Sequence, residues 1–278
     1  MPEDARFCPS CGAPVAVLEA KPVQTRQTLK VTGKPKVVVT NNAPGTVEIK
    51  SGSDGEVVVD FDIREPEDLD WKISQEDNVV TVTCRAKFLP FHWPRYMFSG
   101  GPRANILVIA PAEADLDVEA RLDRVAVTGI RGNIEANSSV AKVKIQDCEG
   151  TVKAVAKTGP VELENVKGTI SVQNTTGTVD LENVSGTVSV QNTTGPIRFS
   201  GELSKGENWF RTTIGSIQVT LRGEPDLTVE AFTRLGRVTC SPELADARYV
   251  RGQYTGRIGA GTGKLIAETE TGTITIRQ

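Results

Sequence analysis

The sequence has no hydrophobic run long enough to cross a membrane as a helix. Its longest apolar stretch, residues 106–112, has the size of a single strand, whereas a membrane-spanning helix needs about 20 apolar residues. The opening MPEDARFCPSCGAPV is polar and acidic and lacks the apolar core of a signal peptide. We therefore expect a cytoplasmic protein, and we expect any membrane association to be peripheral.

Aromatic residues and histidine are scarce as well. Aromatics make up 5% of the 278 residues, so the core must come from Val, Ile, Leu and Ala. The single histidine, His92, offers no Ser-His-Asp arrangement. The sequence shows no long loops that would build a cleft around paired carboxylates. We predict no catalytic residues and no enzymatic activity; a polysaccharide-active β-helix enzyme is the weaker alternative.

Neither sign of charge dominates, and the cysteines do not suggest a disulfide framework. The formal net charge is −3, which argues against a basic, nucleic-acid-seeking surface, so no nucleic acid partner is expected. Five cysteines are an odd number, and two of them form a CxxC pair. This pattern favours a reducing compartment.

What the sequence does have is a repeat. GTISVQNTTG at 168–177 returns as GTVSVQNTTG at 186–195, eighteen residues later. Glycines recur with this spacing at 132, 150, 168 and 186, and again at 159, 177 and 195. A fixed period of this length predicts a stack of similar structural units.

Within each unit, apolar and polar residues alternate until a turn of Asn, Thr and Gly intervenes. Period-two alternation predicts half-buried strands. Such short strands cannot bury a face alone, so we predict that the units stack about 4.8 Å apart and bury shared columns. Two predicted columns are Leu116, Ile134, Val152, Ile170 and Val188, and Val127, Ile145, Leu163, Leu181 and Phe199. The predicted fold is an all-β, single-chain β-solenoid with two-strand rungs of about eighteen residues and little or no helix.

Half-rungs of the form Gly-x-apolar-x-apolar extend the pattern beyond the regular repeats at 114–203. They begin at Gly45, Gly215, Gly236, Gly256 and Gly272, so we expect the solenoid to span residues 34–278. These half-rungs, ILVIAP at 106–111 and NNAPGTVEI at 41–49 resemble the bacterial putative-adhesin β-solenoid family, a domain of unknown function. The resemblance covers roughly residues 30–278. It implies a β-solenoid fold and an envelope or adhesive association, and it implies no catalytic residues.

Residues 1–14 contain FCPSCGA, which resembles one knuckle of a bacterial zinc ribbon. Cys8 and Cys11 can both reach one tetrahedral zinc ion, but a closed structural site needs four ligands. The other cysteines are expected as small core residues: Cys84, Cys148 and Cys240. The pair has three interpretations. It is a degenerate remnant of a zinc ribbon, or it is half of a four-cysteine site shared by two chains. The third interpretation, a redox CxxC, has the least support. Zinc is the one cofactor that the sequence indicates.

Residues 15–33 join the knuckle to the solenoid. The segment 13–33 contains two prolines and mixed charge, and it shows no sustained hydrophobic period. We predict a flexible linker.

The stretch FLPFHWPRYMFSGG at 88–101 holds five of the fourteen aromatic residues. Its prolines exclude a central strand. One interpretation is a plug over an open end or edge of the solenoid. The other is an exposed loop that binds a membrane surface, a peptide or a glycan. The candidate binding residues are Phe91, Trp93, Arg95, Tyr96 and Phe98.

Four acidic residues are predicted to share one outer face of neighbouring rungs: Glu162, Glu164, Asp180 and Glu182. Like charges on adjacent strands repel unless something compensates them. Lys144 should stand one rung from Glu162, and Arg198 one rung from Asp180. The face is either a solvated, partly ion-paired surface or a weak Ca²⁺ site.

Two further motifs are assigned to the scaffold. Asn165 and Asn183, with Asp147 one rung earlier, are expected to form a ladder of turn residues. GAGTGK at 259–264 is superficially similar to a phosphate-binding loop, but Leu265 follows the lysine and no strand-to-helix context exists.

The sequence therefore predicts a non-enzymatic structural or interaction protein. A protein partner or self-association is expected, and contact with a membrane or glycan would use the aromatic loop. The alternative is a regulatory or envelope-associated sensing module that assembles through the zinc knuckle. That alternative differs by predicting metal-dependent assembly.

Overall fold

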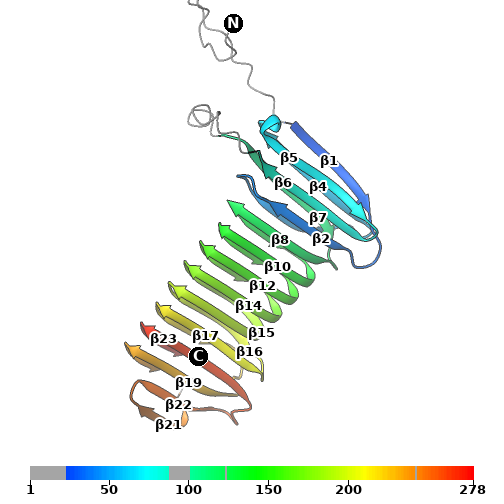
Figure 1. The fold of residues 1–278 in the computed structure, drawn as a ribbon. Coiled ribbons are helices and arrows are strands. Elements are labelled where there is room, and N and C mark those ends of the chain that lie inside the picture. Colours follow the sequence, from blue (N-terminus) through cyan, green and yellow to red (C-terminus); the bar gives the residue numbers. More distant parts are fainter. Residues whose placement is uncertain (1–22, 88–100, 123, 242) are drawn as a thin grey trace, which may run out of the picture.

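The computed structural model describes residues 23–87, 101–122, 124–241 and 243–278. Within them the one helix is the three-residue 3-10 turn η1 (Pro66–Asp68), so no helix there is long enough to span a membrane. The strands wind into an elongated solenoid, with the first strands at one end and the hairpin β21–β22 at the other (Figure 1). The predicted all-β solenoid is confirmed.

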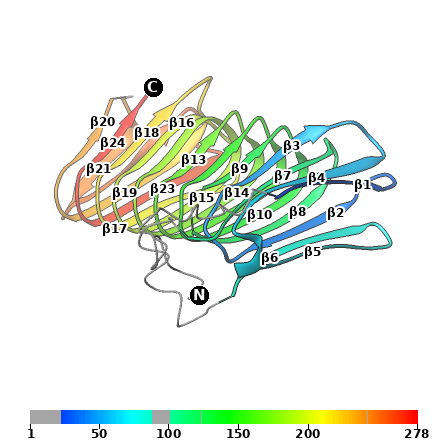
Figure 2. The ribbon, with the colours of Figure 1, turned by 90° about the horizontal axis from the view of Figure 1, so that it is seen from above.

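Each regular rung gives one strand to each of two parallel walls (Figure 2). The long-strand wall contains, in spatial order, β6 (Val79–Ala86), β2 (Lys36–Asn41), β8 (Asp115–Leu122), β10 (Arg131–Val140), β12 (Glu149–Thr158), β14 (Lys167–Thr176), residues 185–194 of β15 (Val179–Thr194), β17 (Glu207–Ile214), β23 (Gly263–Thr271) and β19 (Leu227–Leu235). The short-strand wall contains β7 (Arg103–Pro111), β3 (Val47–Gly52), β9 (Val125–Thr128), β11 (Val143–Gln146), β13 (Val161–Glu164), residues 179–182 of β15, β16 (Ile197–Leu203), β18 (Ile217–Leu221), β24 (Ile274–Arg277) and β20 (Val238–Cys240).

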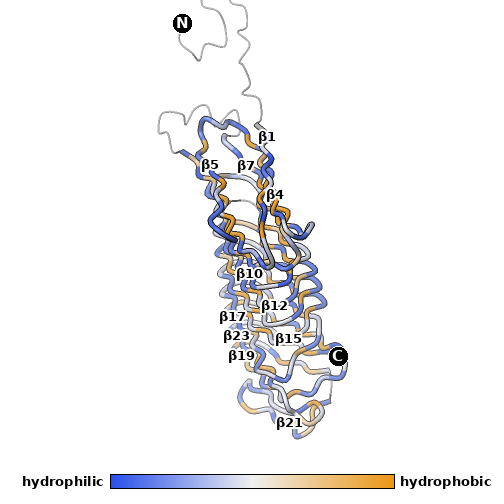
Figure 3. The backbone as a smooth tube through the Cα atoms, turned by 90° about the vertical axis from the view of Figure 1, so that its right-hand side faces the viewer, coloured by the Kyte–Doolittle hydropathy of each residue, from blue (hydrophilic) through white to orange (hydrophobic). Residues whose placement is uncertain are grey.

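Successive rungs stack in the predicted register. Ile134 pairs with Val152, Val152 with Ile170, and Ile170 with Val188, and all four side chains are buried. The column that ends at Phe199 is equally buried. Hydrophobic and hydrophilic residues alternate along the stacked strands (Figure 3). The columns form one continuous core. Stacking therefore buries the apolar face that a single short strand could not bury alone.

Stacked glycines and asparagines shape the turns between the walls. Gly186 has a φ of 132°, and a Cβ atom there would lie 1.9 Å from the carbonyl oxygen of Gly168, so only glycine fits. The preceding turn residues Asp147, Asn165 and Asn183 adopt left-handed φ values of 53–55°. Each asparagine amide donates to the side-chain oxygen one rung earlier, at 2.7 and 2.8 Å. The predicted ladder is confirmed.

Antiparallel strands close the N-terminal end, and the first rung enters the stack out of sequence order. β2 lies between β6 and β8, and β3 lies between β7 and β9. Beyond them, β4 (Glu56–Arg64) pairs with β7, β1 (Val23–Lys30) pairs with β4, and β5 (Leu69–Glu76) pairs with β6.

β1 corrects the prediction of a flexible linker over 15–33. Residues 23–30 pair with β4 along their whole length, so the linker prediction is wrong there. The strand has β4 as its one described partner, and residues 24–30 are mostly exposed. Its polar sequence therefore lacks the alternation that marks a half-buried strand.

The C-terminal end shows the same out-of-order insertion. β23 lies between β17 and β19 (Figure 1), and β24 lies between β18 and β20. β22 (Gln253–Ile258) then pairs antiparallel with β19, and β21 (Ala245–Val250) pairs antiparallel with β22. The half-rung predicted at Gly256 is therefore wrong, because Gly256 belongs to the antiparallel β22.

Asn208 joins the inserted strand β23 to the regular rungs. Its side chain is fully buried, and its Oδ1 accepts a hydrogen bond from the Val188 N–H at 3.0 Å. Its Nδ2 donates to the carbonyls of Ser204, Gly206 and Lys264, each at 3.1 Å. One amide thus connects β15, the turn before β17, and β23.

We expect Asn208→Ala to lower the free energy of unfolding by about 2–4 kcal/mol, because it removes the partner of several buried backbone groups. Urea denaturation measures this change. Asn137→Ala is the control, since Asn137 is half-buried on the outer face and makes one 3.4 Å hydrogen bond to Glu135. We expect the control to change stability by no more than about 0.5 kcal/mol. Equal losses in the two variants would show that Asn208 does not hold the rungs together.

Candidate interaction surface

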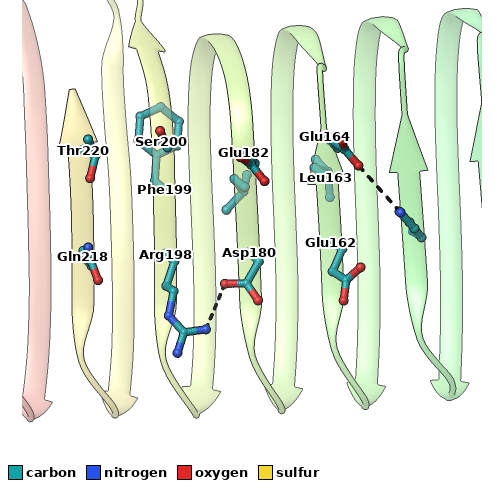
Figure 4. A pocket seen from close by; sticks show the side chains of 12 residues that line it. Glu162, Leu163, Glu164, Asp180, Glu182, Arg198, Phe199, Ser200, Gln218 and Thr220 are labelled. Atoms are coloured by element: carbon teal, nitrogen blue, oxygen red, sulfur yellow. Dashed lines mark hydrogen bonds and ion pairs between the residues drawn. The ribbon is translucent and has the colours of Figure 1, made fainter. Parts of the chain in front are cut away.

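The four acidic residues predicted on one face do lie together. Glu162 of β13 stands in register with Asp180 of β15, and Glu164 stands in register with Glu182. With Lys144 and Arg198 from the neighbouring strands, they line a shallow depression of about 410 Å³ on the outer side of the short-strand wall (Figure 4). We call this depression the acidic groove. Because all its charged side chains come from stacked strands, the rigid scaffold sets their spacing.

Cations compensate three of the four carboxylates. Arg198 Nη1 lies 3.2 Å from Asp180 Oδ1, as the sequence predicted. Lys144 stands in register with Glu162, but its Nζ lies 3.7 Å from Glu164 Oε2. The cation beside Glu162 is Lys142, at 2.6 Å. Strand register therefore does not predict which carboxylate each lysine pairs with, because the long lysine side chains reach beyond their register partners.

Glu182 is the carboxylate left over. It is exposed and has no cation within the described part of the chain, whereas Glu164 also accepts a hydrogen bond from the Gln146 amide. The groove lining therefore holds four carboxylates against Lys144 and Arg198. Exposed ion pairs contribute only about 0–1 kcal/mol each. The charges therefore matter little to folding, and they remain available for contact with another molecule.

The geometry favours the solvated, partly ion-paired interpretation over a Ca²⁺ site. Within the ranges that the structure describes, no three acidic, cysteine or histidine side chains are grouped so that they could hold a metal ion. Calcium takes six to eight oxygen ligands. Three of the four groove carboxylates are instead paired with a Lys or Arg side chain.

Two other predicted sites lie outside the described residues. These are the Cys8–Cys11 pair and the aromatic loop with Phe91, Trp93, Arg95, Tyr96 and Phe98.

The three remaining cysteines belong to the core, as expected. Cys84 and Cys148 are buried, and Cys240 is partly buried against the core. Burial raises the pKa of the Cys84 and Cys240 thiols to about 11, so both stay protonated at neutral pH. Their packing, rather than thiolate chemistry, accounts for their presence.

The glycine-rich loop at 259–264 binds a side-chain carboxylate of the same chain, that of Asp226. Asp226 Oδ1 accepts hydrogen bonds from the backbone N–H groups of Gly261 (2.6 Å) and Thr262 (3.3 Å). The Thr262 hydroxyl donates to Asp226 Oδ2 at 2.6 Å, and these bonds lower the pKa of that carboxyl. Lys264 pairs with Glu230 at 3.1 Å. The loop is thus a structural clamp, and no sequence motif linked it to Asp226.

Comparison with known proteins places these features in a family context. The family model described as Toastrack DUF4097 matches residues 36–277, from the first residue of β2 to the last residue of β24. No curated protein is recognisably similar to the sequence.

Several solved structures resemble this one along most of its length. A putative cell adhesion protein from Clostridium sporogenes is 13% identical, with 93% of this chain and 100% of that chain covered and a TM-score of 0.30. A putative adhesin from Bacteroides fragilis is 14% identical, with 93% and 98% covered and a TM-score of 0.36. A putative lipid binding protein from Parabacteroides distasonis is 11% identical, with 92% and 97% covered and a TM-score of 0.30.

Proposed function

Since this chain belongs to the toastrack DUF4097 family, we propose that it is a non-enzymatic structural and interaction protein that binds a protein partner or a second copy of itself. The repeated positions build the scaffold, and the outward-facing residues between them form the contact surface. We place this activity in the cytoplasm or at a membrane surface that the protein reaches peripherally.

The observation that carries the proposal is the register of the acidic groove. Glu162 and Glu164 stand beside Asp180 and Glu182 on adjacent strands, which lie about 4.8 Å apart. An excess of negative charge held on a rigid sheet suits a partner with a basic segment, because complementary potentials steer association and fix its register. The groove is shallow, and its lining contains no histidine or cysteine, which supports binding rather than catalysis.

Site-specific photo-crosslinking in the native host tests this proposal. A benzophenone amino acid at Ser200, inside the groove, should give a defined adduct, and the same probe at Ser171 on the opposite wall is the matched control. Adding Glu164→Lys and Glu182→Lys should abolish the adduct at Ser200. The groove is not the contact surface if both probes give the same products, or if the charge reversal leaves the adduct unchanged.

The cysteine pair carries a separate proposal, that Cys8 and Cys11 of two chains share one zinc ion. A four-cysteine site shared in this way predicts a dimer with about half a zinc ion per chain. Native mass spectrometry with metal analysis, on protein purified under reducing conditions, measures both quantities. Cys8→Ser should give a zinc-free monomer. If the wild-type protein is already a zinc-free monomer, the pair is a remnant.

A further inference from the structure

The C-terminal tip of the solenoid, residues 232–241 and 243–258, exposes apolar side chains that the core does not use. Eight large hydrophobic residues are exposed in the described chain, and half of them lie in this tip. They are Phe232, Leu235, Tyr249 and Val250, with 40, 64, 61 and 63% of their surface accessible. Exposed apolar side chains that cluster in this way indicate an interaction surface, whereas singly scattered ones are normal on any protein.

A tight hairpin brings Phe232 and Val250 to the same face of the sheet, and Tyr249 lies beside Tyr254 on the other face. The turn between β21 and β22 consists of Arg251 and Gly252, both with left-handed φ values of 49° and 83°, as a two-residue hairpin turn requires. Phe232 and Val250 both stand in register with Gln253, on opposite sides of it. The Thr233 N–H donates to the Gly252 carbonyl at 3.1 Å and fixes the turn against the end of β19.

The same tip is strongly basic. It contains five arginines against Glu243 and Asp246, which gives a local net charge of +3 in a chain whose total is −3. Arg257 forms an ion pair with Asp246. Arg234 lies between Thr233 and Leu235, whose register partners on β23 flank Glu270. The other three arginines are exposed and have no acidic partner within the described ranges: Arg237, Arg248 and Arg251.

We propose that this tip docks end-on to an anionic phospholipid surface. Arginine recognises phosphate through a planar set of donors, and tyrosine favours the boundary between headgroups and acyl chains. Arg237, Arg248 and Arg251 contact headgroup phosphates, while Tyr249 and Val250 enter the interface. The tip is the far end of an elongated molecule (Figure 1), so it can touch a flat surface while the acidic groove stays clear of the negative headgroups.

Protein partners fit this tip less well. Two copies meeting tip to tip would bring like charges together, which disfavours association. Strand addition along β21 is hindered, because Asp246 has a φ of 54° and the register shifts between Ala245 and Arg248. A bulge of this kind twists an edge strand away from a would-be neighbour.

Co-sedimentation with vesicles tests the proposal on the full chain. Wild-type protein should bind vesicles of equal parts phosphatidylglycerol and phosphatidylcholine, and it should not bind phosphatidylcholine alone. Arg248→Gln with Arg251→Gln should weaken binding about 25-fold, since each basic residue near an anionic surface contributes about fivefold. The control is Lys157→Gln with Lys167→Gln, which removes the same charge from exposed lysines of the middle rungs. The control should retain wild-type binding.

Salt dependence and a second set of variants distinguish docking through the tip from docking through another surface. Val250→Ser should weaken binding at both low and high salt, whereas the effect of the arginine substitutions should shrink as salt rises. The proposal is overturned if the wild-type protein ignores the anionic vesicles, or if both double variants lose binding equally. It is also overturned if the tip variants bind normally while Trp93→Ser with Tyr96→Ser abolishes binding. Circular dichroism confirms that each variant is folded.

Discussion

A chain that ends at Thr262 is expected to lose the order of its C-terminal rungs, from β17 onward. This truncation removes β23 and β24, which are hydrogen-bonded on both sides by earlier strands. It also removes five buried apolar side chains: Leu265, Ile266, Ala267, Ile274 and Ile276. Burying each of the four larger ones contributes about 1.5–3 kcal/mol, so the loss should exceed about 5 kcal/mol before the broken strand pairing is counted.

Hydrogen exchange measured by mass spectrometry checks this expectation. Amides of β17, β18 and β19 should lose protection in the truncated chain, while β10 and β12 keep theirs. Two point variants give a milder matched pair. Ile274→Ala should destabilise the protein, whereas the neighbouring outward residue Thr275→Ala should have little effect. Unchanged protection of β19 in the truncated chain would contradict the insertion of β23 beside it.

Val172→Asp is expected to unfold the middle rungs. Val172 is buried between Ala154 and Val190, its register neighbours in the column, and nothing there can pair with a carboxylate. An isolated charge in such a site is strongly unfavourable, and we expect a loss of more than about 4 kcal/mol at neutral pH. Thermal unfolding followed by circular dichroism measures it.

Ser171→Asp is the matched control for Val172→Asp. Ser171 precedes Val172 on the same strand but faces outward, so the control should lie within about 0.5 kcal/mol of the wild type. The buried carboxyl of Val172→Asp should also have a raised pKa, so its defect should be smaller near pH 4 than at pH 8. A defect that does not depend on pH, or equal losses in both variants, would mean that the column is placed wrongly.

The middle of the fold was predictable because the repeat itself encodes the register. A spacing of eighteen residues is enough to place Ile134, Val152 and Ile170 in one column. The two ends were not predictable in this way. Nothing in the sequence of Lys36–Asn41 shows that this strand lies between β6 and β8. Nothing in Gly263–Thr271 shows that it lies between β17 and β19. Their alternation indicates a strand, but not its neighbours.

The candidate sites show the same division between local and long-range information. The acidic groove follows from the repeat, because register places Glu162 beside Asp180. The pairing of Lys144 with Glu164 depends on side-chain reach, which the register does not give. The basic tip was missed because Leu235 and Val250, read singly, look like core residues. The usable signal was the concentration of arginines between 234 and 257.

The out-of-order ends also bear on how the molecule responds to force. In a simple stacked array the last strand lies at an edge, and a pull on the chain end can peel it off one hydrogen bond at a time. Here the final strands β23 and β24 are held on both edges. Tension applied at Gln278 would have to shear two ladders at once. The C-terminus is therefore a mechanical anchor point, and the solenoid cannot unzip from it.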